Sequence, residues 1–197
     1  IKKIKKDEYQ IIITPSDEWL KNASYPVVID PTINYNQNNL SSYIKMKKIT
    51  KGLTTTTTTN NVTVTRYIDS VTKENLSIST IMEIDFSNLP KDVMYSQAIL
   101  RMRGLSDNVS TQTVKLNEIT SNITFDTIKG TSSYNTTFLS TQKLAYTDYY
   151  NFELVDAINR NIATGKALFE FSPSAINGND ISVNFYGFNS HINLFSF

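Results

Sequence analysis

The chain of 197 residues contains no cysteine, one histidine, one tryptophan and only six glycines. The absence of cysteine excludes disulfides and thiolate chemistry, so the stability of the fold has to come from a buried core. Six glycines, none of them clustered, exclude the usual phosphate-binding loops. A zinc site is not expected either, because His191 has no second histidine or cysteine to complete it. We therefore predict a protein without a cofactor or a bound metal.

The sequence also lacks an excess of charge of one sign and any long apolar run. Its 19 basic and 18 acidic side chains give a net charge of +1. This balance argues against a nucleic-acid partner, because phosphate binding needs a concentrated positive surface. The one basic run, Lys2–Lys6, is interpreted as a solvated terminus, with contact to an anionic surface as the alternative. No stretch approaches the roughly 20 apolar residues of a membrane-spanning helix, so membrane insertion is not expected.

The dominant pattern is a two-residue alternation of apolar and polar side chains, which is typical of strands with one buried face. Turn-rich segments separate the alternating stretches, and this spacing predicts an all-β fold, a jelly-roll-like antiparallel β-sandwich. The residues expected on the inward faces are Val62, Val64, Arg66, Ile68, Met82, Ile84, Phe86, Ala98, Leu100, Met102, Val114, Leu116, Ala167, Phe169, Phe171, Ile181, Val183 and Phe185.

Two segments depart from this alternation. Residues 154–163 carry apolar side chains at helical spacing and are followed by Thr164 and Gly165, so we predict one short helix that closes an end of the sandwich. Thr54–Thr59 is a run of six threonines. Because threonine favours strands, this run predicts an exposed loop or an edge strand rather than a linker.

No combination of residues predicts a catalytic centre. Glu83 and Asp85 lie two apart on the expected outer face of one strand. There they keep the sheet soluble, or, as the alternative, form a carboxylate pair for glycoside hydrolysis. Asn177–Asp180 is interpreted as a hairpin turn, with a calcium site as the alternative. We therefore predict no catalytic and no metal-binding residues.

Tyrosine is abundant, with 11 in the chain, and several lie in the least regular region of the sequence. An exposed tyrosine presents a broad apolar face with a polar tip, which suits stacking on sugar rings or a protein interface. The alternative is that these side chains cover the edge of the core. The predicted ligand-binding residues are Tyr134, Tyr146, Tyr149 and Tyr150.

Several segments resemble a known family. Residues 19–33, "WLKNASYPVVIDPTI", are similar to the junction before a DNRLRE-type β-sandwich domain in bacterial wall-associated and Rhs-type surface proteins. Residues 79–104, 114–128 and 150–174 resemble later segments of that domain. Ser77–Ser79 replaces the family's Asp-Asn-Arg, so the chain would be a divergent member. The resemblance implies a sandwich similar to carbohydrate-binding modules and an extracellular location at the cell surface.

The junction also predicts how the chain is divided. Residues 1–31 are expected to be an N-terminal strand arm, the end of a preceding unit, and residues 32–197 the β-sandwich domain. A strand in the arm that is cut off from its sheet leaves backbone groups unpaired, so it has to fold back or pair with a neighbouring molecule. The predicted assembly strand contains Tyr9, Ile11, Ile12 and Ile13.

Two functional hypotheses follow. The first is a non-catalytic extracellular module of a bacterial surface protein that adheres to cell-surface or environmental polysaccharide. The second is a structural subunit of an extracellular fibre, surface layer or spore appendage, which binds identical subunits through its N-terminal strand. An enzyme, such as a lyase or a hydrolase, is a third possibility that no group of residues supports.

Overall fold

The structure is a computed structural model. It describes residues 2–5, 8–10, 14, 16–22, 35–36, 43–68, 71–72, 75–92, 94–104, 112–144, 149–174, 181–186 and 191–196. The chain divides into two units, Ile1–Pro31 and Thr32–Phe197.

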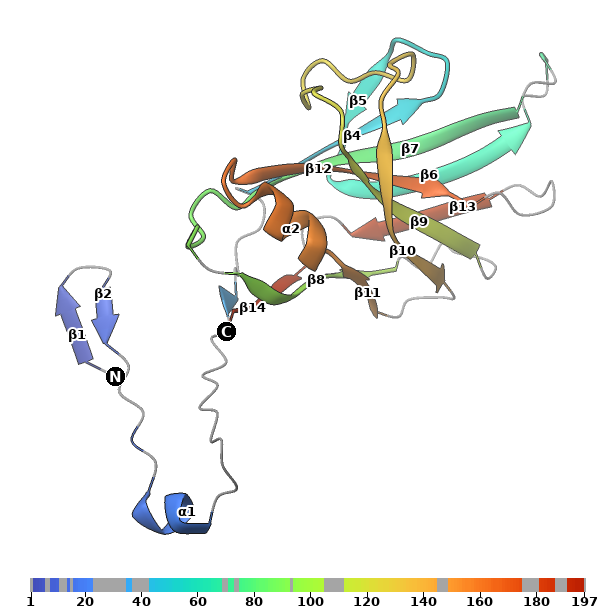
Figure 1. The fold of residues 1–197 in the computed structure, drawn as a ribbon. Coiled ribbons are helices and arrows are strands. Elements are labelled where there is room, and N and C mark those ends of the chain that lie inside the picture. The colour runs from blue at the N-terminus through green and yellow to red at the C-terminus, as the bar shows by residue number, and fades with distance from the viewer. Residues whose placement is uncertain are drawn as a thin grey trace. The chain divides into compact units, whose positions relative to one another are not determined.

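The first unit contains a short hairpin and a short helix (Figure 1). Strand β1 (Lys2–Lys5) pairs antiparallel with β2 (Glu8–Gln10), so Tyr9 of the predicted assembly strand lies opposite Lys3. Ile11–Ile13 lie outside the described residues. Helix α1 (Asp17–Asn22) was not predicted. The sequence features that favour this helix are local: the Ser16 hydroxyl accepts a hydrogen bond from the Trp19 N–H at 3.2 Å, and acidic residues occupy the first turn.

In its described residues, the second unit is built from antiparallel strands and one helix (Figure 1). Its elements are β3 (Tyr35–Asn36), β4 (Ile44–Thr50), β5 (Thr56–Thr58), β6 (Asn61–Ile68), β7 (Asn75–Asp85), β8 (Tyr95–Arg103), β9 (Gln112–Ile119), β10 (Thr136–Leu144), β11 (Tyr149–Glu153), α2 (Val155–Asn161), β12 (Lys166–Pro173), β13 (Ile181–Tyr186) and β14 (His191–Ser196).

Within the described residues, these strands form two sheets. The large sheet has the order β10-β9-β12-β7-β4-β5, and β6 pairs with both β7 and β13. The small sheet has the order β11-β8-β14-β3. Where β6 leaves β7, the Thr80 hydroxyl accepts the Thr63 N–H at 2.9 Å and donates to the Thr63 carbonyl at 2.7 Å. Strand β6 pairs with β13 along residues 61–66 and with β7 along residues 65–68, so β6 connects β13 to the rest of the large sheet.

The main core lies between the two sheets, as the alternation predicts. Met82 and Phe169 of the large sheet share one buried cluster with Leu100 and Phe152 of the small sheet. The expected inward-facing residues from Val62 to Phe171 are buried, except that Arg66 is only partly buried and the side chain of Ile68 lies outside the description. The predicted antiparallel β-sandwich is therefore confirmed. Ile181, Val183 and Phe185 belong to β13, where the register with β6 is described but the side chains are not.

Helix α2 contacts β8 of the small sheet and β12 of the large sheet. Ala157 and Ile158 are buried, and Asn159 forms two hydrogen bonds with the Tyr95 backbone, at 2.8 and 2.9 Å. Gly165 follows the helix with φ +72°, and a Cβ there would lie 2.7 Å from the Ser87 Cα. The predicted helix with its glycine stop is confirmed, and glycine is needed both for the left-handed backbone and for the close approach.

The threonine run contains an edge strand. Thr56–Thr58 form β5, all three residues are exposed, and β5 pairs with β4 at the end of the large sheet. This is the edge strand that the composition of the run predicts.

Candidate functional site

The outer face of the large sheet is not entirely wetted, because the segment between β9 and β10 folds over it. This covering loop, residues 120–135, contributes Ile123, Phe125 and Ile128 to a second apolar cluster with Ile81 and Ile49 of the sheet. Ile128 and Ile81 are fully buried. The alternation along β7 places Ile81 on the face opposite Met82, and the covering loop explains how an isoleucine is stable there.

Two glycines hold the covering loop against the turn between β4 and β5. The Gly52 N–H donates to the Gly130 carbonyl at 3.0 Å, and Gly52 has φ +88°. A Cβ on Gly130 would lie 1.8 Å from the Thr50 carbonyl oxygen, far inside van der Waals contact. Only glycine therefore allows the backbone of the loop to approach the backbone of the sheet this closely.

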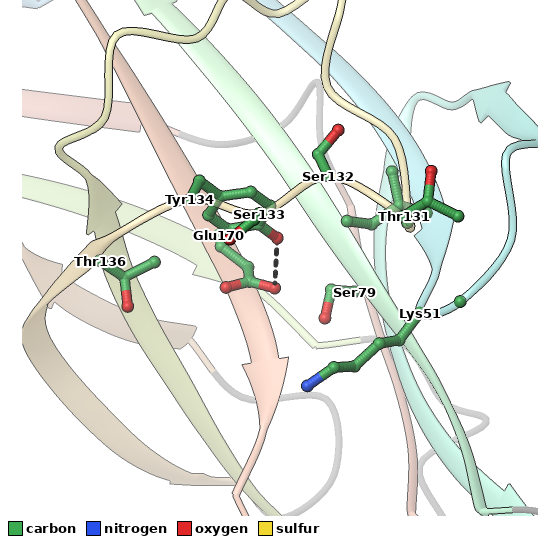
Figure 2. Close-up of a pocket in the computed structure, with 11 residues that line it drawn as sticks. Lys51, Ser79, Thr131, Ser132, Ser133, Tyr134, Thr136 and Glu170 are labelled. Carbon is green, nitrogen blue, oxygen red and sulfur yellow. Dashed lines mark hydrogen bonds between the residues drawn. The ribbon is translucent and has the colours of Figure 1, made fainter.

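A groove of about 630 Å³ lies between the covering loop and the outer face of the sheet (Figure 2). Three neighbouring strands supply its floor, with Glu170 on β12, Ser79 on β7 and Lys51 just after β4. Ser79 is buried, and in Figure 2 it lies between Glu170 and Lys51. The full lining is Ile49, Lys51, Gly52, Ser79, Gly130, Thr131, Ser132, Ser133, Tyr134, Thr136 and Glu170.

Tyr134 and Glu170 point toward each other across this groove (Figure 2). The Tyr134 hydroxyl donates to Glu170 Oε1 at 3.1 Å. Burial, and then the neighbouring carboxylate, raise the pKa of the Tyr134 phenol above its ordinary value, because both oppose a phenolate. Tyr134 thus stays protonated as a donor, and the Glu170 carboxylate keeps acceptor capacity for a hydroxyl of a bound molecule.

Lys51 brings a cation to the same groove. Its side chain is exposed, and no ion pair links it to another residue in the part of the chain that the structure describes. Beneath the covering loop, Lys47 is buried instead and its ammonium lies 4.8 Å from the centre of the Phe125 ring. Burial lowers the pKa of Lys47, and the aromatic face supplies part of the interaction that water would otherwise provide.

The predicted tyrosines do not form one site. Tyr134 lies in the groove on the large sheet, whereas Tyr149 and Tyr150 lie on β11 of the small sheet. Tyr149 is 47% exposed, and the Arg101 guanidinium carbon is 4.3 Å from the centre of its ring. Tyr150 packs against the main core, the alternative role considered for these side chains. Tyr146 lies outside the described residues.

The outer carboxylates of β7 are paired with lysines. Lys45 and Glu83 are register partners with a 3.5 Å ion pair, and Lys166 and Asp85 are register partners with a 3.3 Å ion pair. Hydrogen bonds from Ser87, and then Lys166, lower the pKa of Asp85 below its ordinary value. Two carboxylates that each have a lysine partner are arranged for a soluble sheet face rather than for general acid and base roles.

Sequence reasoning identified one groove residue, Tyr134, and missed Glu170, Ser79 and Lys51. Each of these three looks like an ordinary outward-facing residue of its own strand. Only the strand order β12-β7-β4 brings them side by side, so no local sequence signal identifies them. The described residues contain no cluster of histidine and carboxylate side chains placed to hold a metal ion. Asn177–Asp180 lie outside those residues.

Compared with protein-family models and with curated proteins, the sequence has no match. The resemblance to DNRLRE-type domains stays a prediction. Of the helices in the described ranges, none is long and apolar enough to cross a membrane.

Proposed function

We propose that this chain is a non-catalytic polysaccharide-binding module of a bacterial surface protein and that the groove beneath the covering loop holds the sugar chain. The observation that carries the proposal is the composition of the groove. It combines hydroxyl side chains with one tyrosine, one carboxylate and one lysine, supplied by the covering loop, the outer face of the sheet and the turn after β4. Such a lining offers both donors and acceptors to the hydroxyl groups of a sugar.

The dimensions of the groove floor support this proposal. Glu170 and Ser79 lie on the adjacent strands β12 and β7, and Lys51 follows directly after the next strand, β4, so the floor spans two strand spacings, or roughly 10 Å. This is about the length of a disaccharide. Gly130–Tyr134 of the covering loop form part of the wall, and the groove is open to solvent rather than enclosed, so a long chain can enter without threading through a closed cavity.

The test uses variants that keep the shape of the groove. Tyr134→Phe retains the ring over the second apolar cluster but removes the hydroxyl, and Glu170→Gln retains the size of the side chain but removes its charge. A lost hydrogen bond to a charged group costs about 1.5–3 kcal/mol, so each variant should weaken binding about 10- to 100-fold. Retention on gels of xylan, pectin, mannan, chitin and cellulose measures this effect.

Tyr149→Phe is the matched control, because Tyr149 is an exposed tyrosine outside the groove. Retention of the parent chain on none of the gels would count against polysaccharide binding. If Tyr149→Phe weakened retention and Tyr134→Phe did not, the sugar site would lie on β11 of the small sheet and not in the groove.

A further inference from the structure

Among the described residues, the strand order of the large sheet ends at β5, which pairs with β4 alone (Figure 1). The Thr59 N–H donates to the Met46 carbonyl at 3.1 Å, so Thr59 and Met46 form a hydrogen-bonded residue pair. Along two antiparallel strands, such pairs alternate with residue pairs that share no hydrogen bond. Because the next register pair joins Thr58 to Lys47, the N–H and C=O groups of Thr58, and likewise of Thr56, point away from β4. This edge therefore offers a row of donors and acceptors to another strand.

Of the features that usually protect an edge strand, β5 has a short length but lacks lysine, proline and a bulge. Residues 52–65 contain no charged residue and no proline, and the pairing of β4 with β5 has no bulge. Leu53, next to this strand, is 47% exposed. The neutral side chains of this stretch therefore allow another strand to pair here and do not repel it.

The opposite end of the same sheet does carry protection. Strand β10 has a bulge between Phe138 and Ser140, and it contacts β11 of the small sheet. There the Gln142 side-chain amide donates to the Asn151 carbonyl at 2.6 Å. The contrast between β10 and β5 identifies β5 as the open end of this path of strands.

We propose that two copies of this chain pair antiparallel through β5 and join their large sheets into one continuous sheet. A charged partner finds no opposite charge in residues 52–65, whereas a second copy brings the same neutral threonines and forms favourable cross-strand threonine pairs. Because both copies use the same strand, the contact is self-complementary and closes at two copies. A three-residue strand buries far less than the roughly 1,600 Å² of a standard interface, so the dimer is weak.

The symmetry of this pairing decides where the two grooves lie. Antiparallel strands in one sheet are related by a two-fold axis perpendicular to the sheet, so the same face of each copy points the same way. The groove is on the outer face, and Lys51 and Gly52 of its lining lie in the turn that leads into β5. The dimer thus presents two grooves on one face. If the groove binds polysaccharide as proposed above, one chain engages both and gains avidity.

Molar mass as a function of concentration, measured on the full chain by light scattering and sedimentation equilibrium, tests the dimer without any ligand. We expect monomers at about 1 μM and dimers at a few hundred μM, the range of a small interface. Thr58→Pro removes an outward N–H without removing a bond to β4, so it should stay folded and monomeric. Thr58→Lys should be monomeric at low salt and regain the dimer in about 1 M salt, because screening weakens the repulsion between the two lysines.

Thr141→Lys is the matched control, since it adds the same charge to β10, the strand at the opposite end of the order β10-β9-β12-β7-β4-β5. This variant should dimerise like the parent chain. A parent chain that stays monomeric at every concentration overturns the proposal, as does an unchanged dimer in Thr58→Pro or an assembly larger than two copies. Failure of polysaccharide binding leaves these mass measurements unaffected, so the two proposals fail separately. If both hold, Thr58→Pro should lower retention on a polysaccharide gel while leaving affinity for a short oligosaccharide of the same sugar unchanged.

Discussion

At the scale of single residues, Gly130 fixes the position of the groove wall. Its missing side chain lets the covering loop rest directly on the Thr50 carbonyl, next to the hydrogen bond from Gly52. We expect Gly130→Ala to push the loop outward, because the oxygen that a Cβ would strike belongs to the backbone and cannot rotate away. The loss in the free energy of unfolding should be about 1–3 kcal/mol, and binding to the polysaccharide that retains the parent chain should be lost. Urea denaturation and gel retention measure the two effects.

Lys129→Ala is the control for this change, since Lys129 is the exposed neighbour of Gly130 in the same loop. Its free energy of unfolding should stay within about 0.5 kcal/mol of the parent value. Parent-like retention of Gly130→Ala would show that the loop does not need this close approach to form a binding wall.

Single residues also show where prediction from the sequence ends. Tyr134 could be identified because tyrosine has a chemical character of its own in an irregular segment. Glu170 and Ser79 could not, because their importance comes from lying on neighbouring strands rather than from residue type. The close contact at Gly130 could not be predicted either, since a glycine after a lysine in a loop looks like any turn residue.

At the scale of elements, helix α2 is attached to the large sheet by a buried carboxylate. Glu118 of β9 is 3% exposed and accepts hydrogen bonds from Arg160 and Asn161 at the end of the helix. The Arg160 Nε donates at 3.1 Å and the Asn161 amide at 2.7 Å. A buried carboxylate is tolerated when its oxygens accept hydrogen bonds in this way, and it destabilises the fold when one of these donors is removed.

We therefore expect Arg160→Ala to lower the free energy of unfolding by about 1–3 kcal/mol, because it leaves Glu118 without its cationic partner. The Arg160 side chain is itself half-exposed, so water replaces part of the lost interaction. The double variant Glu118→Leu with Arg160→Met should recover most of this lost free energy of unfolding, since the apolar side chains leave no buried charge that needs a partner. Thermal and urea unfolding provide the values, with Arg103→Ala, an exposed arginine of β8, as the neutral control. A double variant as unstable as Arg160→Ala would contradict this account.

Elements also differ in how well the sequence predicts them. The strands of the sandwich could be predicted because alternation in Met82–Phe86 or Ala98–Met102 follows directly from a sheet with one buried face. The covering loop could not be predicted, because Ile123, Phe125 and Ile128 follow no strand or helix period. Ile81 was the available signal, as an isoleucine on a face that alternation assigns to water. Helix α1 was missed because six residues are too few for periodicity to appear.

At the scale of the whole molecule, the core and the groove both belong to the second unit. Every residue of the two apolar clusters and of the groove lining lies between residues 44 and 171. Strand β5, the last of the described strand order, is in the same range. The groove and β5, on which the two proposals depend, therefore both lie within Thr32–Phe197.

The division into two units allows the two functional hypotheses to be separated by removing the first unit. Deleting residues 1–31 should leave the melting temperature within about 3 °C of that of the full chain, a change of about 1 kcal/mol or less, because no described core residue is removed. The shortened chain should also retain its dimer and its polysaccharide binding. A structural subunit that assembles through Tyr9 and the strand around it predicts the opposite for assembly, namely loss of all association with the fold intact. Sedimentation equilibrium of both forms at the same concentrations distinguishes the two, because β5 remains in the shortened chain and β2 does not.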